Sequence, residues 1–167
     1  AEGGKLEPAL AALARYRGLG RGFEQLGEVR GIRFVDDYAH HPTELVATLE
    51  AARQAFPGRR IIAVFQPHLF SRTAAHAGAM GQALTGVDLA IVTEIYPARE
   101  APIPGVSGRL VWEAARAAGA TVIFEPEKAR LGDLIMEHAR SGDVVLTLGA
   151  GDVTRVGREL MQWLRAA

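Results

Sequence analysis

Short apolar runs of strand length alternate with helical patterns along most of this chain. The run Ile61–Phe65 is five consecutive apolar residues, as expected of a parallel strand buried on both faces. Other segments fit strands at residues 23–29, 32–36, 89–93, 121–124 and 143–148, and helices at residues 45–56, 73–84, 109–118, 128–138 and 153–165. This alternation predicts an α/β, Rossmann-like, three-layer domain. Its sheet is mainly parallel, with a β-hairpin made by the first two strands.

The first residues do not fit that domain. Apolar residues recur at helical spacing over residues 6–17, and the Gly-rich stretch 18–22 then breaks the pattern. One helix ahead of a linker cannot bury its own apolar face. We therefore interpret residues 1–20 as the trailing helix and linker of a preceding domain, and residues 21–167 as one domain, which suits a typical domain size of ~150 residues.

Composition excludes several classes of function. Nineteen basic and nineteen acidic residues give a formal net charge of zero, so the basic surface that nucleic acid requires is not expected. The chain has no cysteine, which excludes disulfides, cysteine-based zinc sites and thiol catalysis. No apolar run approaches the ~20 residues of a membrane helix, and the expected location is the cytoplasm. Neither a phosphate-loop motif nor a Gly-x-Ser-x-Gly motif occurs in the sequence.

Polar segments follow several of the predicted strands. They are residues 36–41, 66–73, 94–100 and 149–152. In open α/β sheets, ligands bind beyond the carboxyl ends of the strands, so these four segments should lie along one edge of the sheet.

Residues 36–41 combine two carboxylates, a phenol and two imidazoles: Asp36, Asp37, Tyr38, His40 and His41. Such groups are able to bind a metal, act as acid or base near neutral pH, or accept hydrogen bonds from a ribose diol. The structural alternative is that one aspartate caps the following helix and a histidine packs against a neighbouring loop.

The segment 66–73 leaves the most buried strand and enters a helix. Arg72 near the helix N-terminus would make an anion site for a carboxylate or phosphate. Alternatively, Ser71 caps the helix and Arg72 is solvated. The Gly149-Ala150-Gly151-Asp152 turn is either half of a dinucleotide-binding motif or a tight turn with Asp152 as the helix cap. The Pro-rich loop over residues 96–105 is long enough to border a site.

Taken together, these segments resemble a known family. The motifs FVDDYAHHPTE (34–44), FQPHLFSRT (65–73), IYPARE (95–100), PIPG (102–105) and GAGD (149–152) closely resemble the C-terminal domain of the Mur ligase family of peptidoglycan synthesis. The resemblance is to the members that join L-alanine to UDP-N-acetylmuramate. The combination of the two histidine-containing motifs is highly specific, and the resemblance covers roughly residues 6–164.

The resemblance implies an ATP- and Mg²⁺-dependent amide-forming ligase of three domains, in which an acyl phosphate of the muramate carboxylate is attacked by the amine of L-alanine. This domain would be a lid that is inactive alone, with no catalytic residue and no metal ligand of its own. Its partners would be the central ATPase domain and the N-terminal UDP-sugar domain.

The resemblance also assigns residues. Asp37 and His41 would contact the nucleotide, with Asp37 on the ATP ribose. His68, Arg72, Tyr38 and His40 would receive L-alanine, with Arg72 the partner of its carboxylate.

The sequence departs from the family pattern at two positions, where Gly22 and Leu69 stand in place of arginines found in relatives.

Three other functions stay open. One is the related ligase that attaches a recycled tripeptide to the same UDP-sugar, and another is a stand-alone nucleotide-binding module. The third is a metal hydrolase built on Asp36, Asp37, His40, His41 and His68.

Overall fold

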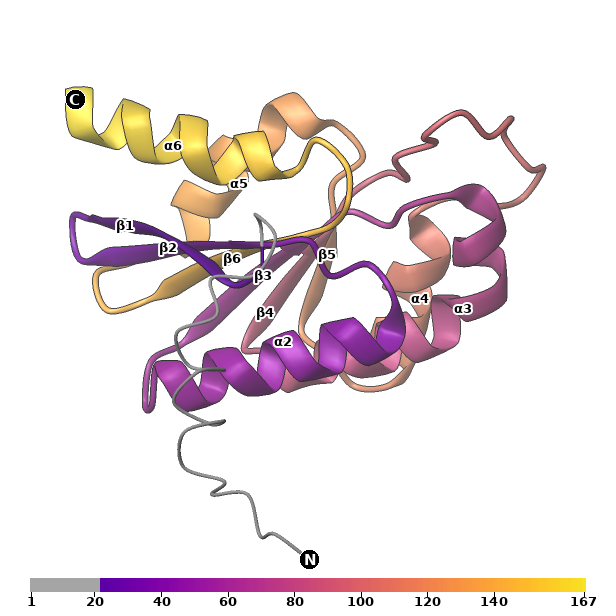
Figure 1. Cartoon of the computed structure of the whole chain (residues 1–167), viewed down its shortest axis with the longest axis horizontal. Coiled ribbons are helices and arrows are strands. Elements are labelled where there is room, and N and C mark those ends of the chain that lie inside the picture. Colours follow the sequence, from indigo (N-terminus) through magenta and orange to yellow (C-terminus); the bar gives the residue numbers. More distant parts are fainter. Residues whose placement is uncertain (1–21) are drawn as a thin grey trace, which may run out of the picture.

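The structure, a computed structural model, describes residues 22–167. The helix predicted over residues 6–17 and most of the predicted linker lie outside the described residues. The described part contains a six-stranded sheet in the order β1-β2-β6-β3-β4-β5 (Figure 1). These strands are β1 (Glu24–Val29), β2 (Ile32–Asp37), β3 (Ile61–Phe65), β4 (Leu89–Val92), β5 (Val122–Phe124) and β6 (Val144–Leu148). Only the β1–β2 pair is antiparallel, so the predicted fold class and hairpin are confirmed.

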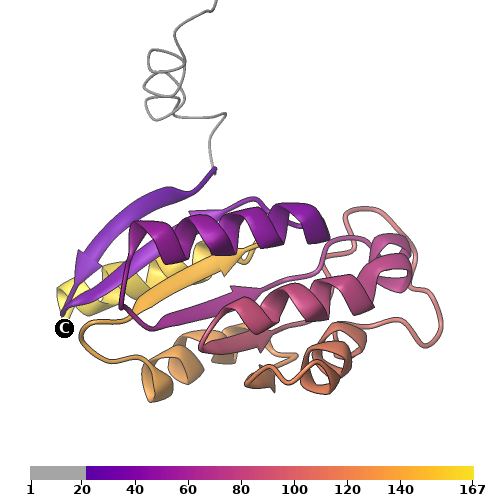
Figure 2. The same cartoon turned by 90° about the horizontal axis from the view of Figure 1, so that it is seen from below.

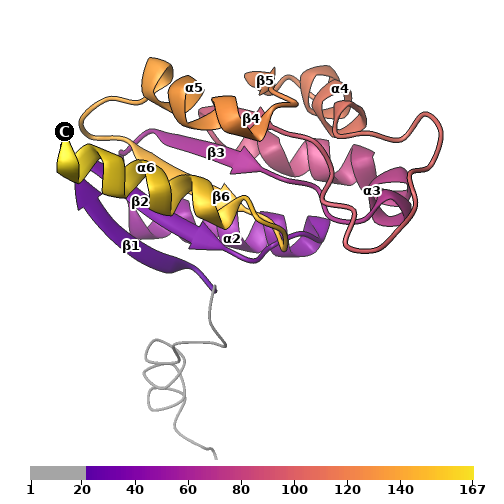
Figure 3. The same ribbon diagram turned by 90° about the horizontal axis from the view of Figure 1, so that it is seen from above.

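Helices cover both faces of this sheet. One face carries α2 (Pro42–Ala55), α3 (Phe70–Ala83) and α4 (Arg109–Ala117), which lie toward the viewer in Figure 2. The other carries α5 (Leu131–His138) and α6 (Thr154–Ala166), which lie toward the viewer in Figure 3. Two 3-10 turns, Leu84–Gly86 and Lys128–Arg130, complete the described elements.

The central strand β3 contributes side chains to both halves of the core, one on each face of the sheet. Ile61, Ala63 and Phe65 pack with the residues under α2, α3 and α4. Ile62 and Val64 point to the opposite face and pack under α5 and α6. All five are fully buried, because successive side chains of a strand alternate between its faces and both faces here are covered. This is the burial that the unbroken apolar run predicts.

The β1–β2 hairpin closes with a two-residue loop. Arg30 and Gly31 have φ angles of 52° and 77°, and Val29 pairs with Ile32. Positive φ at both loop positions is typical of the type I′ turn, whose twist matches that of the two strands. A β-bulge between Gln25 and Gly27 shifts the register of β1.

The strand register brings the carboxyl ends of the parallel strands to one level. Asp37 pairs with Leu148, Leu148 with Phe65, and Phe65 with Val92, which in turn pairs with Phe124. The polar segments that follow these strands therefore share one edge of the sheet, as predicted.

Besides α2, which begins at Pro42 rather than at residue 45, two helices start three residues from the predicted position. The first, α3, begins at Phe70, three residues earlier than expected, because Leu69 adopts a φ of 70° and its carbonyl accepts the Thr73 N–H at 3.1 Å. The second, α5, begins at Leu131, because Lys128–Arg130 forms a 3-10 turn first.

None of the helices over residues 22–167 is long and apolar enough to cross a membrane.

Candidate functional site

The site begins at the end of β2, where Asp37 is buried with only 8% of its surface exposed. Its carboxylate accepts three hydrogen bonds: from the Ala39 N–H at 2.7 Å, the Thr48 hydroxyl at 3.1 Å and the Phe23 N–H at 2.5 Å. Burial raises the pKa of Asp37 above its ordinary value, while these hydrogen bonds oppose the change. Asp37 thus fixes the turn that leads from β2 into α2.

The first turn of α2 fixes the two histidines. His41 is its N-cap, and its Nδ1 accepts the Thr43 N–H at 3.4 Å. The Glu44 carboxylate reaches back and accepts the N–H groups of His40 and His41, each at 3.0 Å. This reciprocal arrangement is a capping box. The alternative that an aspartate caps this helix is therefore wrong, because His41 occupies the N-cap position.

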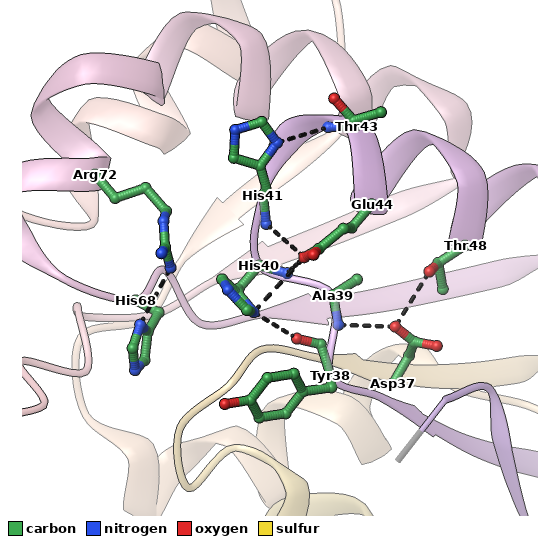
Figure 4. A network of polar contacts seen from close by, with 10 residues as sticks. All are labelled: Asp37, Tyr38, Ala39, His40, His41, Thr43, Glu44, Thr48, His68 and Arg72. Atoms are coloured by element: carbon green, nitrogen blue, oxygen red, sulfur yellow. Dashed lines mark hydrogen bonds and ion pairs between the residues drawn. The ribbon is translucent and has the colours of Figure 1, made fainter. Parts of the chain in front are cut away.

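Four rings follow one another across the edge of the sheet. The Tyr38 and His40 ring centroids are 5.1 Å apart, those of His40 and His68 5.4 Å, and those of His68 and Tyr96 5.8 Å. These rings come from the ends of β2, β3 and β4. Residues separated by about sixty positions in the chain thus form one continuous surface, part of which is seen in Figure 4.

Arg72 joins this surface from the first turn of α3. Its guanidinium lies 3.3 Å from Nδ1 of His68, and Figure 4 shows the two side chains facing each other. Burial and electrostatic repulsion from His40 and Arg72 lower the pKa of His68, against an opposing effect of Glu100. A neutral His68 is able to accept the guanidinium hydrogen bond, so Arg72 is oriented but its positive charge is not neutralised.

All six residues predicted to contact ligands lie on this edge. Tyr38, His40, His68 and Arg72 gather together, with Tyr38 46% exposed. Asp37 lies beyond His40, and its carboxylate faces Thr48 of α2 rather than Arg72 (Figure 4). The His41 ring packs against His76 of α3, with centroids 5.1 Å apart. The predicted amino-acid and nucleotide sets are thus neighbours that face different directions.

Asp36 lies apart from this surface. It is fully buried, and its carboxylate accepts the hydroxyls of Thr147 at 2.6 Å and Thr154 at 2.8 Å. Successive residues of β2 point to opposite faces, which separates Asp36 from Asp37. Among residues 22–167, no three or more His, Asp or Glu side chains are grouped so that they could hold a metal ion. This geometry does not favour the hydrolase hypothesis.

The glycine turn after β6 packs tightly against Gln66. A Cβ on Gly149 would lie 2.7 Å from the Gln66 carbonyl oxygen, and one on Gly151 would lie 2.3 Å from Gln66 Oε1. Asp152 does not cap α6, contrary to that alternative. Its carboxylate accepts hydrogen bonds from Gln66 at 2.9 Å and Lys128 at 2.5 Å. Burial alone would raise the pKa of Asp152, but these hydrogen bonds outweigh it and the pKa lies below its ordinary value.

Four residues of the site were not assigned by sequence reasoning. Glu44 caps α2, Thr48 contacts Asp37, Tyr96 stacks on His68, and Glu100 contacts Ser71. The Ser71 N–H and hydroxyl both donate to Glu100, so Ser71 is not the N-cap of α3. The polar segment 94–100, the IYPARE motif and the length of the 96–105 loop were the signals available for Tyr96 and Glu100.

Comparison with known proteins defines the class. Residues 20–151 match the family described as "Mur ligase, glutamate ligase domain". Because this match covers well over half of the sequence, the chain belongs to the Mur ligase family. Individual members of the family are also similar to this chain. The chain is 52% identical to the UDP-N-acetylmuramate--L-alanine ligase of Streptomyces avermitilis over 92% of its length, and 54% identical to that of Cutibacterium acnes over 91%.

Solved structures agree with that assignment. The UDP-N-acetylmuramate-alanine ligase of Thermotoga maritima has a TM-score of 0.75 at 28% identity, over 98% of this chain and 34% of that one. A murein peptide ligase of Psychrobacter arcticus has a TM-score of 0.71 at 24% identity, over 93% of this chain and 32% of that one, which shows the shared fold. The chain spans about a third of the length of the relatives it matches: 33% of the Streptomyces avermitilis ligase and 32% of the Cutibacterium acnes ligase.

Proposed function

We propose that this chain is the L-alanine-binding lid of an ATP-dependent ligase that joins L-alanine to UDP-N-acetylmuramate in peptidoglycan precursor synthesis. The observation that carries the proposal is the meeting of Arg72, His68, His40 and Tyr38 at one edge of the sheet. It is supported by about half-identical relatives that bear that ligase's name. The proposal places the reaction in the cytoplasm, with the central ATPase domain and the UDP-sugar domain as partners.

The chemistry of the edge suits an amino acid. The Arg72 guanidinium, in the first turn of α3, offers forked donors to a carboxylate. His68 is uncharged at neutral pH because its pKa is lowered, so it does not repel the amino group of the substrate. The exposed Tyr38 ring provides the side of the site that faces solvent, and the His40 ring lies between it and His68. Holding the amine beside an activated carboxylate is catalysis by positioning.

ATP with Mg²⁺ supplies the phosphoryl group that activates the muramate carboxylate, and both bind mainly outside this chain in our proposal. The residues present fit one part of the nucleotide. The Asp37 carboxylate has about four lone-pair sites, of which three accept the hydrogen bonds described above. One site is left for a ribose hydroxyl. Binding both hydroxyls of the diol requires one present donor, such as the Phe23 N–H, to move away.

The decisive experiment measures phosphate release by the full-length enzyme that contains this domain. We expect release to require UDP-N-acetylmuramate, ATP and L-alanine together. Replacing L-alanine with the recycled tripeptide tests the related ligase, and turnover with the tripeptide but not with alanine would overturn the proposal.

Calorimetric titration of the 167-residue chain with ATP tests the stand-alone nucleotide-binding module. The lid hypothesis predicts no tight binding, whereas a module would bind ATP tightly.

A further inference from the structure

The segment over residues 96–100 is bound directly to the start of α3. The Tyr96 N–H donates to the Pro67 carbonyl at 2.8 Å, and the Leu69 N–H donates to the Tyr96 carbonyl at 3.0 Å. His68 and Tyr96 form an isolated parallel bridge outside the named strands. The loop after β4 is therefore an extension of the sheet at this edge rather than a free connection, and it projects beside α3 in Figure 1.

The N-terminus of α3 has no cap from its own sequence. Leu69 occupies the N-cap position with a φ of 70°, and its side chain cannot accept a hydrogen bond. A residue other than glycine rarely adopts such an angle without support from its surroundings. Glu100 supplies the acceptor instead. Its carboxylate accepts the Ser71 N–H at 3.0 Å and the Ser71 hydroxyl at 2.5 Å, across 29 positions of sequence.

This contact lies between the two groups assigned to L-alanine. Ser71 directly precedes Arg72, and the strained Leu69 directly follows His68. Tyr96, four residues before Glu100, stacks on the His68 ring at an interplanar angle of 14°. Releasing Glu100 would free both the turn that sets the direction of Arg72 and the loop that holds Tyr96 against His68.

We propose that Glu100 is a positioning residue for the amino-acid site. By clamping Ser71, it holds the His68 ring and the Arg72 guanidinium in the geometry that receives the carboxylate of L-alanine. This inference rests on the proposed function for its substrate, and on the contacts above for its geometry. Glu100 does not contact the substrate. The hydroxyl of Ser71 acts only as the partner of Glu100.

The contact between Glu100 and Ser71, which we call the clamp, has a second measurable consequence, and it is electrostatic. The two hydrogen bonds from Ser71 lower the pKa of Glu100, which keeps it ionised. That negative charge raises the pKa of His68, against the lowering by burial, His40 and Arg72. Removing the charge should therefore change the titration of His68 as well as its position.

The kinetic test uses the full-length enzyme with Glu100→Gln, Ser71→Ala, the double variant and the conservative Ser71→Thr. We expect the KM for L-alanine to rise about 10-fold in Glu100→Gln and Ser71→Ala, with the KM for ATP unchanged. The double variant should be no worse than either single variant, because the two residues form one contact. Ser71→Thr keeps the hydroxyl and should behave as wild type. Glu113→Gln, an exposed change on α4, is the matched control.

The second test needs no activity. Side-chain NMR of the 167-residue chain should show altered His68 and Arg72 signals in Glu100→Gln and Ser71→Ala, a lower His68 pKa in Glu100→Gln, and no change in Glu113→Gln. An unchanged alanine KM together with unchanged His68 and Arg72 signals would overturn the clamp while leaving the proposed function intact. Loss of alanine dependence in the wild type would instead overturn the proposed function, and NMR alone would then decide the clamp.

Discussion

The orientation of Arg72 depends on its neighbour four residues earlier. His68 accepts its guanidinium hydrogen bond at 3.3 Å only while the imidazole is neutral, and burial together with repulsion from His40 and Arg72 favours that form by lowering the pKa of His68. A guanidinium held by a neutral partner keeps its full charge for a carboxylate.

Arg72→Ala should therefore raise the KM for L-alanine by about 10- to 100-fold, the effect of losing a charged hydrogen bond of roughly 1.5–3 kcal/mol. The KM for ATP should hardly change. Steady-state phosphate release by the full-length enzyme measures both. Arg72→Lys keeps the charge but loses the planar fork, and we expect an intermediate KM. An unchanged alanine KM in Arg72→Ala would remove this residue from the role assigned to it.

Asp37 is a test of the nucleotide assignment, because its carboxylate has a structural role and a proposed binding role. Asp37→Ala should raise the KM for ATP and leave the KM for L-alanine unchanged. Thr48→Ala is the control, since it removes one hydrogen bond to Asp37 but keeps the carboxylate. If both variants lower the melting temperature and neither changes ATP use, the role of Asp37 is structural alone.

Among the elements, the β6–α6 turn shows why glycine is required at a particular place. A Cβ on Gly151 would approach Tyr96 Cγ to 2.6 Å and Gln66 Oε1 to 2.3 Å. Gln66 is buried and cannot move freely, because its side chain holds both Asp152 and the Val153 N–H.

We expect Gly151→Ala to destabilise the domain by about 1–3 kcal/mol through overpacking. Chemical denaturation monitored by circular dichroism measures this change. The control is Gly78→Ala in α3, where an added Cβ meets nothing within 4 Å. That change should stabilise the helix by about 0.5–1 kcal/mol. Equal effects at the two positions would show that the close approach at Gly151 is not limiting.

At the scale of the whole molecule, stability should depend on pH in the acid range. Hydrogen bonds and ion pairs lower the pKa values of Asp88, Asp152 and Glu44 below their ordinary values of 3.8 and 4.5, against the effect of burial. A lowered pKa in the folded state stabilises the fold above the unfolded pKa, and this contribution is lost as pH falls through the folded pKa. Asp37 acts in the opposite sense, because its raised pKa favours the fold at low pH and loses that contribution as pH rises.

The groups with a lowered pKa outnumber the one with a raised pKa. The melting temperature should therefore decrease as the pH is lowered from 6 to 3. Differential scanning calorimetry across this range provides the measurement. Asp88→Asn should reduce the slope, because Asp88 accepts the Ile61 N–H and pairs with Arg53, each at 2.8 Å. A melting temperature that is unchanged or higher at pH 3 would contradict this prediction.

The sequence alone determined the strands, the order of elements and the edge on which the polar segments meet. The strands follow from local pattern: the run Ile61–Phe65 is buried because it is apolar throughout. The shared edge follows from the fold class, because the carboxyl ends of parallel strands lie at the same edge of the sheet. The sequence also placed Tyr38, His40, His68 and Arg72 in one group, through the family resemblance.

Only the tertiary structure decided which way each polar group faces. Asp36 and Asp37 are adjacent in sequence, yet one bonds Thr147 and the other Thr48, because the pleat turns them to opposite faces. The start of α3 was missed because its cap, Glu100, lies 29 positions away. Periodicity records a helix's own apolar face, but carries no information about a partner that a distant loop brings to its first turn.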